Sequence, residues 1–277
     1  RPQPGLKSQH LRAIEAIQKI APVSKFSQVE LGSTECWFHP GTIKSGTYDF
    51  DIKTAGSISL FLQSMLMPSL FAPAKITLTI IGGTCGKWQA SVDYLQQLVI
   101  PNLQRFATKI NLSVRKRGYY PKGGGEIVLE ISPKIKLKDF KLCTECLDFV
   151  ASNTKPFTFI KQGKLEYVKG FVNTSQALSD KQVSQRIEAA AVASLRNLSV
   201  PISIDQGYFP SKSIGGELLL WSLHSNNGDL DPQNCVRLAA TALIEPRISS
   251  EEIGQLAAKK LKALLDSDAA VDHFLAD

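Results

Sequence analysis

The sequence feature that most constrains the fold is a cluster of four cations that leads directly into three consecutive glycines. The stretch is Arg115-Lys116-Arg117-Gly118-Tyr119-Tyr120-Pro121-Lys122-Gly123-Gly124-Gly125-Glu126. Strand-like residues flank it on both sides (111–114 and 127–131), so the pattern predicts a strand–turn–strand unit. Glycines accept positive φ and leave backbone N–H groups uncovered, so such a turn can hold an anion beside Arg and Lys side chains. The alternative is a glycine-rich hairpin whose charges only keep a sheet edge soluble.

The composition is typical of a folded chain with a polyanionic partner. A length of 277 residues allows one large domain or two ordinary ones, and 43% hydrophobic with 21% charged residues suits a packed core. The net charge of +7 favours association with polyanions such as RNA. No apolar run reaches the roughly 18 residues that a membrane-spanning helix needs, and no signal-peptide pattern opens the chain. We therefore expect no membrane partner.

The five cysteines are too scattered for a disulfide framework or a zinc site. One CxxC pair, Cys143 with Cys146, has neither a second pair nor a nearby histidine, whereas a structural zinc needs about four ligands. We expect no metal ligands among them. The pattern favours a reducing compartment, the cytoplasm or the nucleus.

Hydrophobic periodicity predicts strands alternating with helices. We expect helices over 7–20, 54–71 and 92–106, strands over 76–81 and 110–114, and antiparallel strands with turns over 27–50. An exposed strand is expected over 134–138, followed by a β-α-β-β stretch. Capping boxes at Ser179 with Gln182 and at Ser249 with Glu252 predict the starts of two later helices. The alternation indicates an α/β or α+β fold.

Four side chains are candidates for ligand contacts on position alone. His10 lies on the apolar face of the first helix, which predicts a core histidine or, alternatively, a contact to a phosphate or base. Gln63 lies in a helix that is apolar nearly all round, so we expect a buried amide bonded to backbone or to a ligand. Phe274 and Asp277 share a helix face and could hold a nucleobase, the alternative being a packed aromatic beside a solvated acid.

Several segments together resemble the RNA 3′-terminal phosphate cyclase family. The similarity runs in register along the whole chain and is weakest between 133 and 235. The matching segments are Arg1-Pro2-x-Pro4-Gly5-Leu6 with Gln9-His10-Leu11, Gly32-Ser33-Thr34-Glu35, Pro40-Gly41 with Gly46, Thr54-Ala55-Gly56-Ser57, Gln63, Gly82-Gly83-Thr84, Asp93-Tyr94, Arg117 to Glu126, and Val271-Asp272 with Phe274-Leu275-Ala276-Asp277.

The resemblance implies repeated β/α units, each a four-stranded sheet backed by two helices, interrupted by a smaller inserted α/β domain. The expected core spans 1–134 and 236–277, and the expected insert spans 135–235. The implied reaction uses ATP and a divalent metal (Mg or Mn) to convert the 3′-phosphate of an RNA to a 2′,3′-cyclic phosphate. In that family a histidine forms a covalent adenylate, AMP passes to the RNA 3′-phosphate, and the neighbouring 2′-OH displaces AMP.

Site residues carried over by position fall into two groups. The expected ATP contacts are Gln63, Phe274, Leu275, Ala276 and Asp277. The expected phosphate or RNA contacts are Arg1, Gln9, His10, Arg117 and Lys122. No metal ligand is expected within the chain.

The chain departs from the family pattern at three places. The acidic Gly-rich segment expected before Arg1 is absent, and the nucleophilic histidine is expected after Asp277, since none of the four histidines matches it. The segment Cys85–Ser91 replaces a Pro-containing stretch, and Ala90 stands where a proline packs on adenine, although Trp88 could compensate by stacking.

Two alternative interpretations remain. One is a non-catalytic, cyclase-like RNA-binding protein in ribosome or RNA maturation. The other is an enolpyruvyl-transferase-like enzyme.

Overall fold

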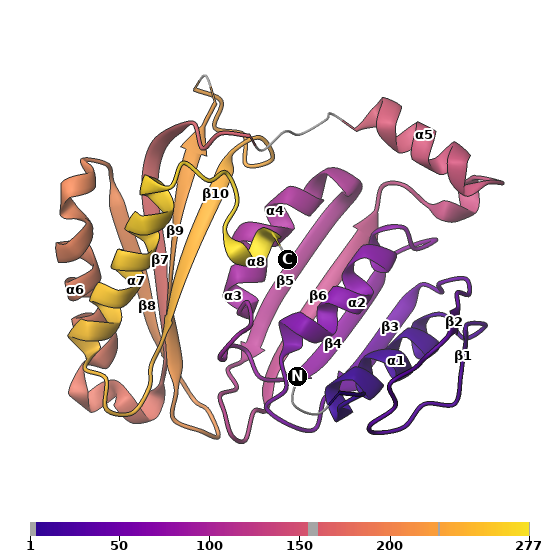
Figure 1. Ribbon diagram of the computed structural model, residues 1–277, viewed down its shortest axis with the longest axis horizontal. Helices are drawn as coiled ribbons and strands as arrows, with labels where there is room; N and C mark the ends of the chain where they lie inside the picture. The colour runs from indigo at the N-terminus through magenta and orange to yellow at the C-terminus, as the bar shows by residue number, and fades with distance from the viewer. Residues whose placement is uncertain (1–3, 155–159, 227, 277) are drawn as a thin grey trace.

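Two four-stranded sheets form the framework of the protein (Figure 1). The computed structural model describes residues 4–154, 160–226 and 228–276. Each sheet contains one parallel strand pair and is otherwise antiparallel, which confirms the expected mixed α/β class. No helix in the described part of the chain is long and apolar enough to cross a membrane.

The first sheet has the strand order β3-β4-β6-β5. Its strands are β3 (Gly46–Asp51), β4 (Ile76–Gly82), β5 (Ala107–Lys116) and β6 (Gly125–Pro133). β3 runs parallel to β4, so only the short pair β1 (Lys25–Phe26) and β2 (Phe38–His39) supports the antiparallel structure expected over 27–50. The β3–β4 crossover is α2, and this right-sized helical connection is what a parallel pair requires.

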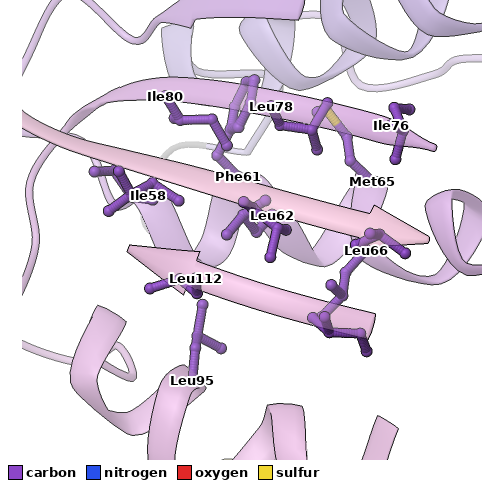
Figure 2. Packing of buried hydrophobic residues seen from close by; sticks show 14 of the residues in the cluster. Ile58, Phe61, Leu62, Met65, Leu66, Ile76, Leu78, Ile80, Leu95 and Leu112 are labelled. Atoms are coloured by element: carbon purple, nitrogen blue, oxygen red, sulfur yellow. The ribbon is translucent and has the colours of Figure 1, made fainter. Parts of the chain in front are cut away.

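Helix α2 (Ile58–Leu70) fills the core of this first unit. Strand side chains alternate between buried and half-buried along β4 and β6, which gives the sheet one apolar face. α2 presents residues at three- and four-residue spacing to that face (Figure 2). The cluster includes Ile58, Phe61, Leu62, Met65, Leu66, Ile76, Leu78 and Ile80. α1 (Ser8–Ile20) adds Ala16 and Ile20 to the same core.

The helical segment 92–106 connects the two units. It comprises α3 (Val92–Tyr94), a π-helical turn (Leu95–Val99), α4 (Ile100–Leu103) and a short 3₁₀ turn (Gln104–Phe106). Val92 and Leu95 belong to the core of the first sheet. Tyr94 and Leu98 pack instead against Leu219, Trp221 and Ala239 of the second sheet. One continuous segment therefore contributes to both hydrophobic cores.

The second sheet has the order β10-β9-β7-β8 and is covered on both faces. Its strands are β7 (Lys164–Ser175), β8 (Ile202–Phe209), β9 (Gly216–Ser225) and β10 (Val236–Leu243). α6 (Val183–Leu195) and α7 (Ser250–Asp266) pack on one face, and the segment 92–106 packs on the other. All ten residues of β9 are buried for this reason. Each main sheet thus has at least two helices packed on it.

The predicted boundary of the insert at residue 235 divides this second sheet. β10, placed in the core by the prediction, is hydrogen-bonded to β9, which was placed in the insert. α7 then packs on the same sheet as α6. Strand pairing therefore groups 164–225 with 236–266, because β10 completes a sheet that would otherwise expose an edge of β9.

One shorter prediction about local structure was wrong, and one helix was not predicted. Residues 134–138 do not form a strand but lead into a 3₁₀ turn (Leu137–Asp139). α5 (Cys143–Asn153) follows as a helix that periodicity did not indicate, and it lies apart from both sheets in Figure 1. α8 (His273–Ala276) is the last described element and lies beside α3 and α4.

Candidate functional site

The glycine-containing segments of the sequence converge at one edge of the first sheet. β3 and β4 both end at this edge, and β6 begins there. The N–H of Gly83 donates to the carbonyl of Gly56 (2.8 Å), and the N–H of Thr84 donates to the carbonyl of Gly118 (2.8 Å). Thr84 Oγ1 in turn accepts from the Gly118 N–H at 3.2 Å. We call the three segments 54–57, 82–84 and 118–125 the glycine loops.

Close backbone approach explains why glycine is required within the glycine loops. A Cβ atom at Gly123 would lie 2.7 Å from the carbonyl oxygen of Thr54, and Gly123 also has φ of +61°. A Cβ at Gly118 would lie 2.1 Å from the backbone nitrogen of Gly125. Both positions exclude any larger residue, because such contacts are far below van der Waals distance.

Gln9 and His10 bring the start of α1 to this edge. A Cβ at Gly56 would lie 3.3 Å from Gln9 Oε1, so the Gln9 amide borders the glycine loops. His10 is half-buried, and its Nδ1 accepts from the N–H of Lys7 at 3.0 Å. His10 therefore caps α1, a role that neither sequence interpretation had included. Arg1, expected in the same cleft, lies outside the described residues.

Arg117 occupies the interior and not the RNA-facing surface that we expected. It is 6% exposed, and its guanidinium forms a two-point pair with Asp93, with Nη2 donating to Oδ1 at 2.9 Å. The rings of Phe171 and Phe209 lie 5.4 and 5.1 Å from its Cζ. Burial lowers the pKa of Arg117, but the charge and hydrogen bonds of Asp93 outweigh it, so the pKa is raised. Its donors are thus directed to Asp93, and we withdraw it as a phosphate contact.

The Arg117–Asp93 pair extends into a buried polar network between the two units. Asn173 on β7 donates to Asp93 Oδ2 at 3.0 Å, and the hydroxyl of Tyr119 donates to Asn173 Oδ1 at 3.0 Å. Glu217 on β9 belongs to the same region and is 1% exposed. Burial, together with the charge of Asp93, raises the pKa of Glu217 from its usual 4.5 to about 8. The polar residues of the basic turn therefore join the first unit to the second.

Lys122 is the expected phosphate contact that does lie at the surface. Its side chain is exposed, and its backbone N–H donates to Ser213 Oγ at 3.1 Å. Ser213 belongs to the loop between β8 and β9 of the second unit. The glycine-rich turn therefore contacts both units and leaves the Lys122 ammonium free to reach a ligand.

Gln63 is exposed, contrary to the prediction of a buried amide. α2 is apolar nearly all round, but only the side facing the sheet is buried, so Leu60, Gln63 and Met67 lie on its outer side. Apolar composition alone could not distinguish the two sides. An exposed amide needs no internal partner, so Gln63 is available to a ligand.

Ser59 connects the start of α2 to the segment 85–91. Its hydroxyl bonds to the carbonyl of Ala90 and lies 2.7 Å from Ser57 Oγ. Gln63 follows Ser59 by four residues, about one helical turn. The segment 85–91 is therefore held to the first turn of α2 at Ser59, one turn before Gln63. Trp88 at its centre is 93% exposed and has φ of +58°.

Phe274 on α8 packs on the same apolar cluster as Ala90 of this segment. Its ring lies edge-on to Tyr94, with centroids 5.4 Å apart. The segment 85–91 thus contacts α2 directly and shares an apolar cluster with α8. Leu275 is half-buried and Ala276 is exposed. Asp277, expected to contact the nucleotide, lies outside the described residues.

Asp272 fixes α8 in place and was quoted in the sequence only as part of a motif. It is 1% exposed, and its Oδ1 accepts from the Tyr94 hydroxyl at 2.6 Å. Oδ2 accepts from the N–H of Ala239 on β10 at 2.9 Å. The N–H of Phe274 also donates to Oδ1 (3.0 Å). One carboxylate therefore orients the aromatic side chain against both units.

Asp93 and Glu217 are the site-region residues that sequence reasoning assigned no role. The detectable signal for Glu217 is a carboxylate within a run of apolar residues over 216–221. No three His, Cys, Asp or Glu side chains gather into a metal site within 4–154, 160–226 and 228–276. The residues in hand therefore do not identify a preformed metal site.

Comparison with known proteins gives a consistent match along the whole chain. A family model described as RNA 3′-terminal phosphate cyclase matches residues 1–277. A protein named RNA 3′-terminal phosphate cyclase from Archaeoglobus fulgidus is 35% identical over 277 residues, covering 100% of this chain and 74% of the relative. Proteins of the same name from Pyrococcus furiosus and Methanosarcina barkeri are 32% and 34% identical, with 72% and 73% of their lengths covered and 100% of this chain in each comparison.

Proposed function

Because the chain belongs to the RNA 3′-terminal phosphate cyclase family, we propose that it takes part in ATP-dependent cyclisation of RNA 3′-phosphates. The product is an RNA with a 2′,3′-cyclic phosphate. The observation that carries the proposal is that Ala90 contacts the first turn of α2, one turn before Gln63, and packs on the same apolar cluster as Phe274. An amide, an aromatic ring and a Gly-rich edge are groups suited to a nucleotide.

The proposed chemistry activates the RNA phosphate in two covalent steps. A histidine nitrogen attacks the α-phosphorus of ATP, and the bond to pyrophosphate breaks. An oxygen of the RNA 3′-phosphate then attacks the same phosphorus, and the histidine leaves. Finally the 2′-OH loses its proton and attacks the 3′-phosphorus, which expels AMP. Each activation supplies a good leaving group where the free phosphate has none.

The nucleophilic histidine is not assigned among residues 1–277. His10 caps α1, and His224 is buried, with a pKa lowered by burial and a ring nitrogen 2.9 Å from Ser222 Oγ. His10 is used in the cap of α1 and His224 is buried in β9, so we assign neither as the nucleophile. We keep the expectation that the nucleophile corresponds to the family histidine and not to one of these side chains.

The proposed ATP contacts lie around the segment 85–91. Phe274 stacks on the adenine, and Trp88 supplies the opposite surface in place of the family's proline. Gln63 contacts the nucleotide from α2, with Leu275, Ala276 and Asp277 completing the wall. The exposure of Trp88 and Gln63 supports this assignment, because neither side chain is used in the core. We also propose that a divalent cation binds the ATP phosphates, and we assign it no step of the reaction.

The proposed RNA contacts lie at the glycine loops. Gln9, His10 and Lys122 border this edge, and Arg1 is retained as an expectation from the family pattern. A cytoplasmic or nuclear location is also part of the proposal. It is supported by the cysteines, all five of which are free thiols.

The test is labelled-nucleotide transfer with the full-length protein and α-labelled ATP. We expect an acid-labile protein–AMP adduct, and conversion of a 3′-phosphorylated RNA to a phosphatase-resistant end. An RNA of the same sequence with a 3′-OH serves as the control and should remain unchanged. Folded protein that binds RNA but forms neither adduct nor cyclic end would contradict the proposal and favour the non-catalytic RNA-binding alternative.

A further inference from the structure

Three exposed lysines from separate segments lie on or next to the glycine-rich turn. Lys122 belongs to the turn itself, Lys53 directly precedes the glycine loop 54–57, and Lys212 lies on the loop between β8 and β9. All three are exposed. Within the part of the chain that the structure describes, none of them forms an ion pair. Unpaired cations gathered at one place raise the local potential for an anion.

Lys212 is held against the turn by its neighbours. Ser213 Oγ accepts from the Lys122 N–H, and Ser211 Oγ donates to the Ser213 carbonyl at 2.9 Å. The side chain of Lys212 lies over Gly124, where an added Cβ would meet its Cδ at 3.0 Å and its Nζ at 3.1 Å. A residue with a side chain at Gly124 would displace this ammonium. Glycine at this position therefore allows the Lys212 side chain of the second unit to lie against the glycine-rich turn of the first unit.

Lys53 lies next to the same turn and has a strained backbone conformation. Its φ is +62°, a conformation that costs a residue with a Cβ about 1–2 kcal/mol. Its N–H donates to the carboxylate of Asp51 at 2.7 Å, which fixes this turn of the chain. A Cβ at Gly123 would lie 2.8 Å from the Cα of Ala55, so the segment that follows Lys53 touches the turn that carries Lys122.

Tyr120, two residues before Lys122, adds an aromatic surface to the same turn. It is 81% exposed, whereas the adjacent Tyr119 is 2% exposed and bonded to Asn173. Its ring is thus free of the core. Exposed aromatic rings interleaved with basic side chains are the usual means of binding single-stranded nucleic acid.

We propose that Lys53, Lys122, Lys212 and Tyr120 bind the single-stranded RNA just upstream of its reacting 3′ end. The lysines contact successive phosphodiesters, and a base stacks on Tyr120. The inference rests on the proposed function for the identity of the ligand as RNA. It adds that the second unit contributes to substrate binding through Lys212, on the loop that contacts the glycine-rich turn.

The experiment measures binding of 3′-phosphorylated oligonucleotides of 2 to 12 nucleotides over a range of salt concentrations. Wild-type affinity should rise with length and fall with salt. Each phosphate contact on a single strand contributes about 0.7 to the log–log salt slope. We expect Lys212→Ala to lower the slope by about 0.7, and the triple Lys→Ala variant by about 2. Tyr120→Ala should weaken binding several-fold without changing the slope.

Lys259→Ala is the matched control, since Lys259 is exposed on α7. This helix packs on the face of the second sheet opposite to the segment 92–106. An unchanged slope in the triple variant, with unchanged thermal stability, would overturn the inference. Self-adenylation with ATP, measured in wild type and Lys259→Ala, tests the proposed cyclase activity separately and should be equal in the two. Length-dependent binding that the lysines control, in a protein that forms no adenylate, would overturn the proposed cyclase activity while supporting this RNA-binding surface.

Discussion

The buried pair of Arg117 and Asp93 determines what substitutions at the basic turn do. Removing one partner of a buried pair leaves an uncompensated charge, which costs about 3–5 kcal/mol. We expect Arg117→Ala to lower the thermal midpoint strongly. Arg117→Lys should also destabilise, because a single ammonium cannot make both bonds to the carboxylate. Thermal denaturation monitored by circular dichroism measures the midpoint of both variants.

Arg115→Ala is the control for charge, since Arg115 is exposed two residues away. It should change stability by no more than about 0.5 kcal/mol. A folded Arg117→Lys variant of normal stability with weakened RNA binding would contradict this assignment. It would restore Arg117 as a phosphate contact.

Glu217 makes stability depend on pH. Its pKa is raised from 4.5 to about 8 in the folded protein, so the folded state holds a proton that the unfolded state releases. The contribution to stability is complete below pH 4.5 and is lost as the pH rises toward 8. Glu217→Gln, a neutral isostere, should therefore be relatively more stable than wild type at pH 8 than at pH 5. Thermal midpoints of both proteins across this range provide the measurement, and parallel curves would contradict it.

The residue scale is where sequence reasoning was weakest. Arg115, Lys116 and Arg117 are neighbours in one charged run, yet only Arg117 is buried. A strand places successive side chains on opposite faces, but the pattern does not state which face meets a second unit. The partner Asp93 lies 24 residues earlier in the chain. Pairing of this kind is decided by tertiary packing and not by local composition.

At the scale of elements, we expect substitutions on the exposed and buried sides of α2 to have different effects on stability. Gln63 lies on the exposed side, so Gln63→Ala should leave the free energy of unfolding within about 0.5 kcal/mol of wild type. We expect it to weaken ATP binding, measured by calorimetry. Met67→Ala, one turn further along the same side, is the control and should alter neither quantity. Normal ATP affinity in Gln63→Ala would remove Gln63 from the nucleotide site.

The two predicted capping boxes show when a local sequence pattern predicts the start of a helix. The capping box at Ser249 is confirmed, because Ser249 Oγ accepts from the Glu252 N–H at 3.2 Å and Glu252 accepts from the Ser249 N–H at 2.8 Å. The box at Ser179 is not formed. A 3₁₀ turn occupies 176–181, and α6 begins after Gln182 in a left-handed conformation. The residue spacing alone therefore does not decide between an α-helix and a 3₁₀ turn.

For the whole molecule, the alternation of strands and helices predicted the class of fold, and the family resemblance implied the sheet-and-helix units. Neither could indicate that β10 completes the second sheet. The alternating run 236–242 reads equally well as a strand of either unit, because pairing between strands distant in sequence leaves no local signal. The convergence of Gly56, Gly83 and Gly123 was likewise anticipated only as separate motifs, although each glycine was visible in the sequence.

The shared segment 92–106 predicts that the two units unfold together. Leu98 is fully buried against the second sheet, whereas Leu95 is packed in the core of the first. Leu98→Ala should cost about 2–5 kcal/mol. It should also weaken the coupling between the units, because it removes contacts that only one unit makes with the segment. Calorimetry should show one transition for wild type, and a broadened or divided transition for the variant.

Leu261→Ala is the matched control, since Leu261 is equally buried but lies in the core between α7 and the second sheet, away from the segment 92–106. It should lower stability by a similar amount while the transition stays single. Two resolved transitions in wild type would show that the units are independent. The buried network from Asp93 to Asn173 would then contribute to the position of the glycine-rich turn without coupling the stability of the two units.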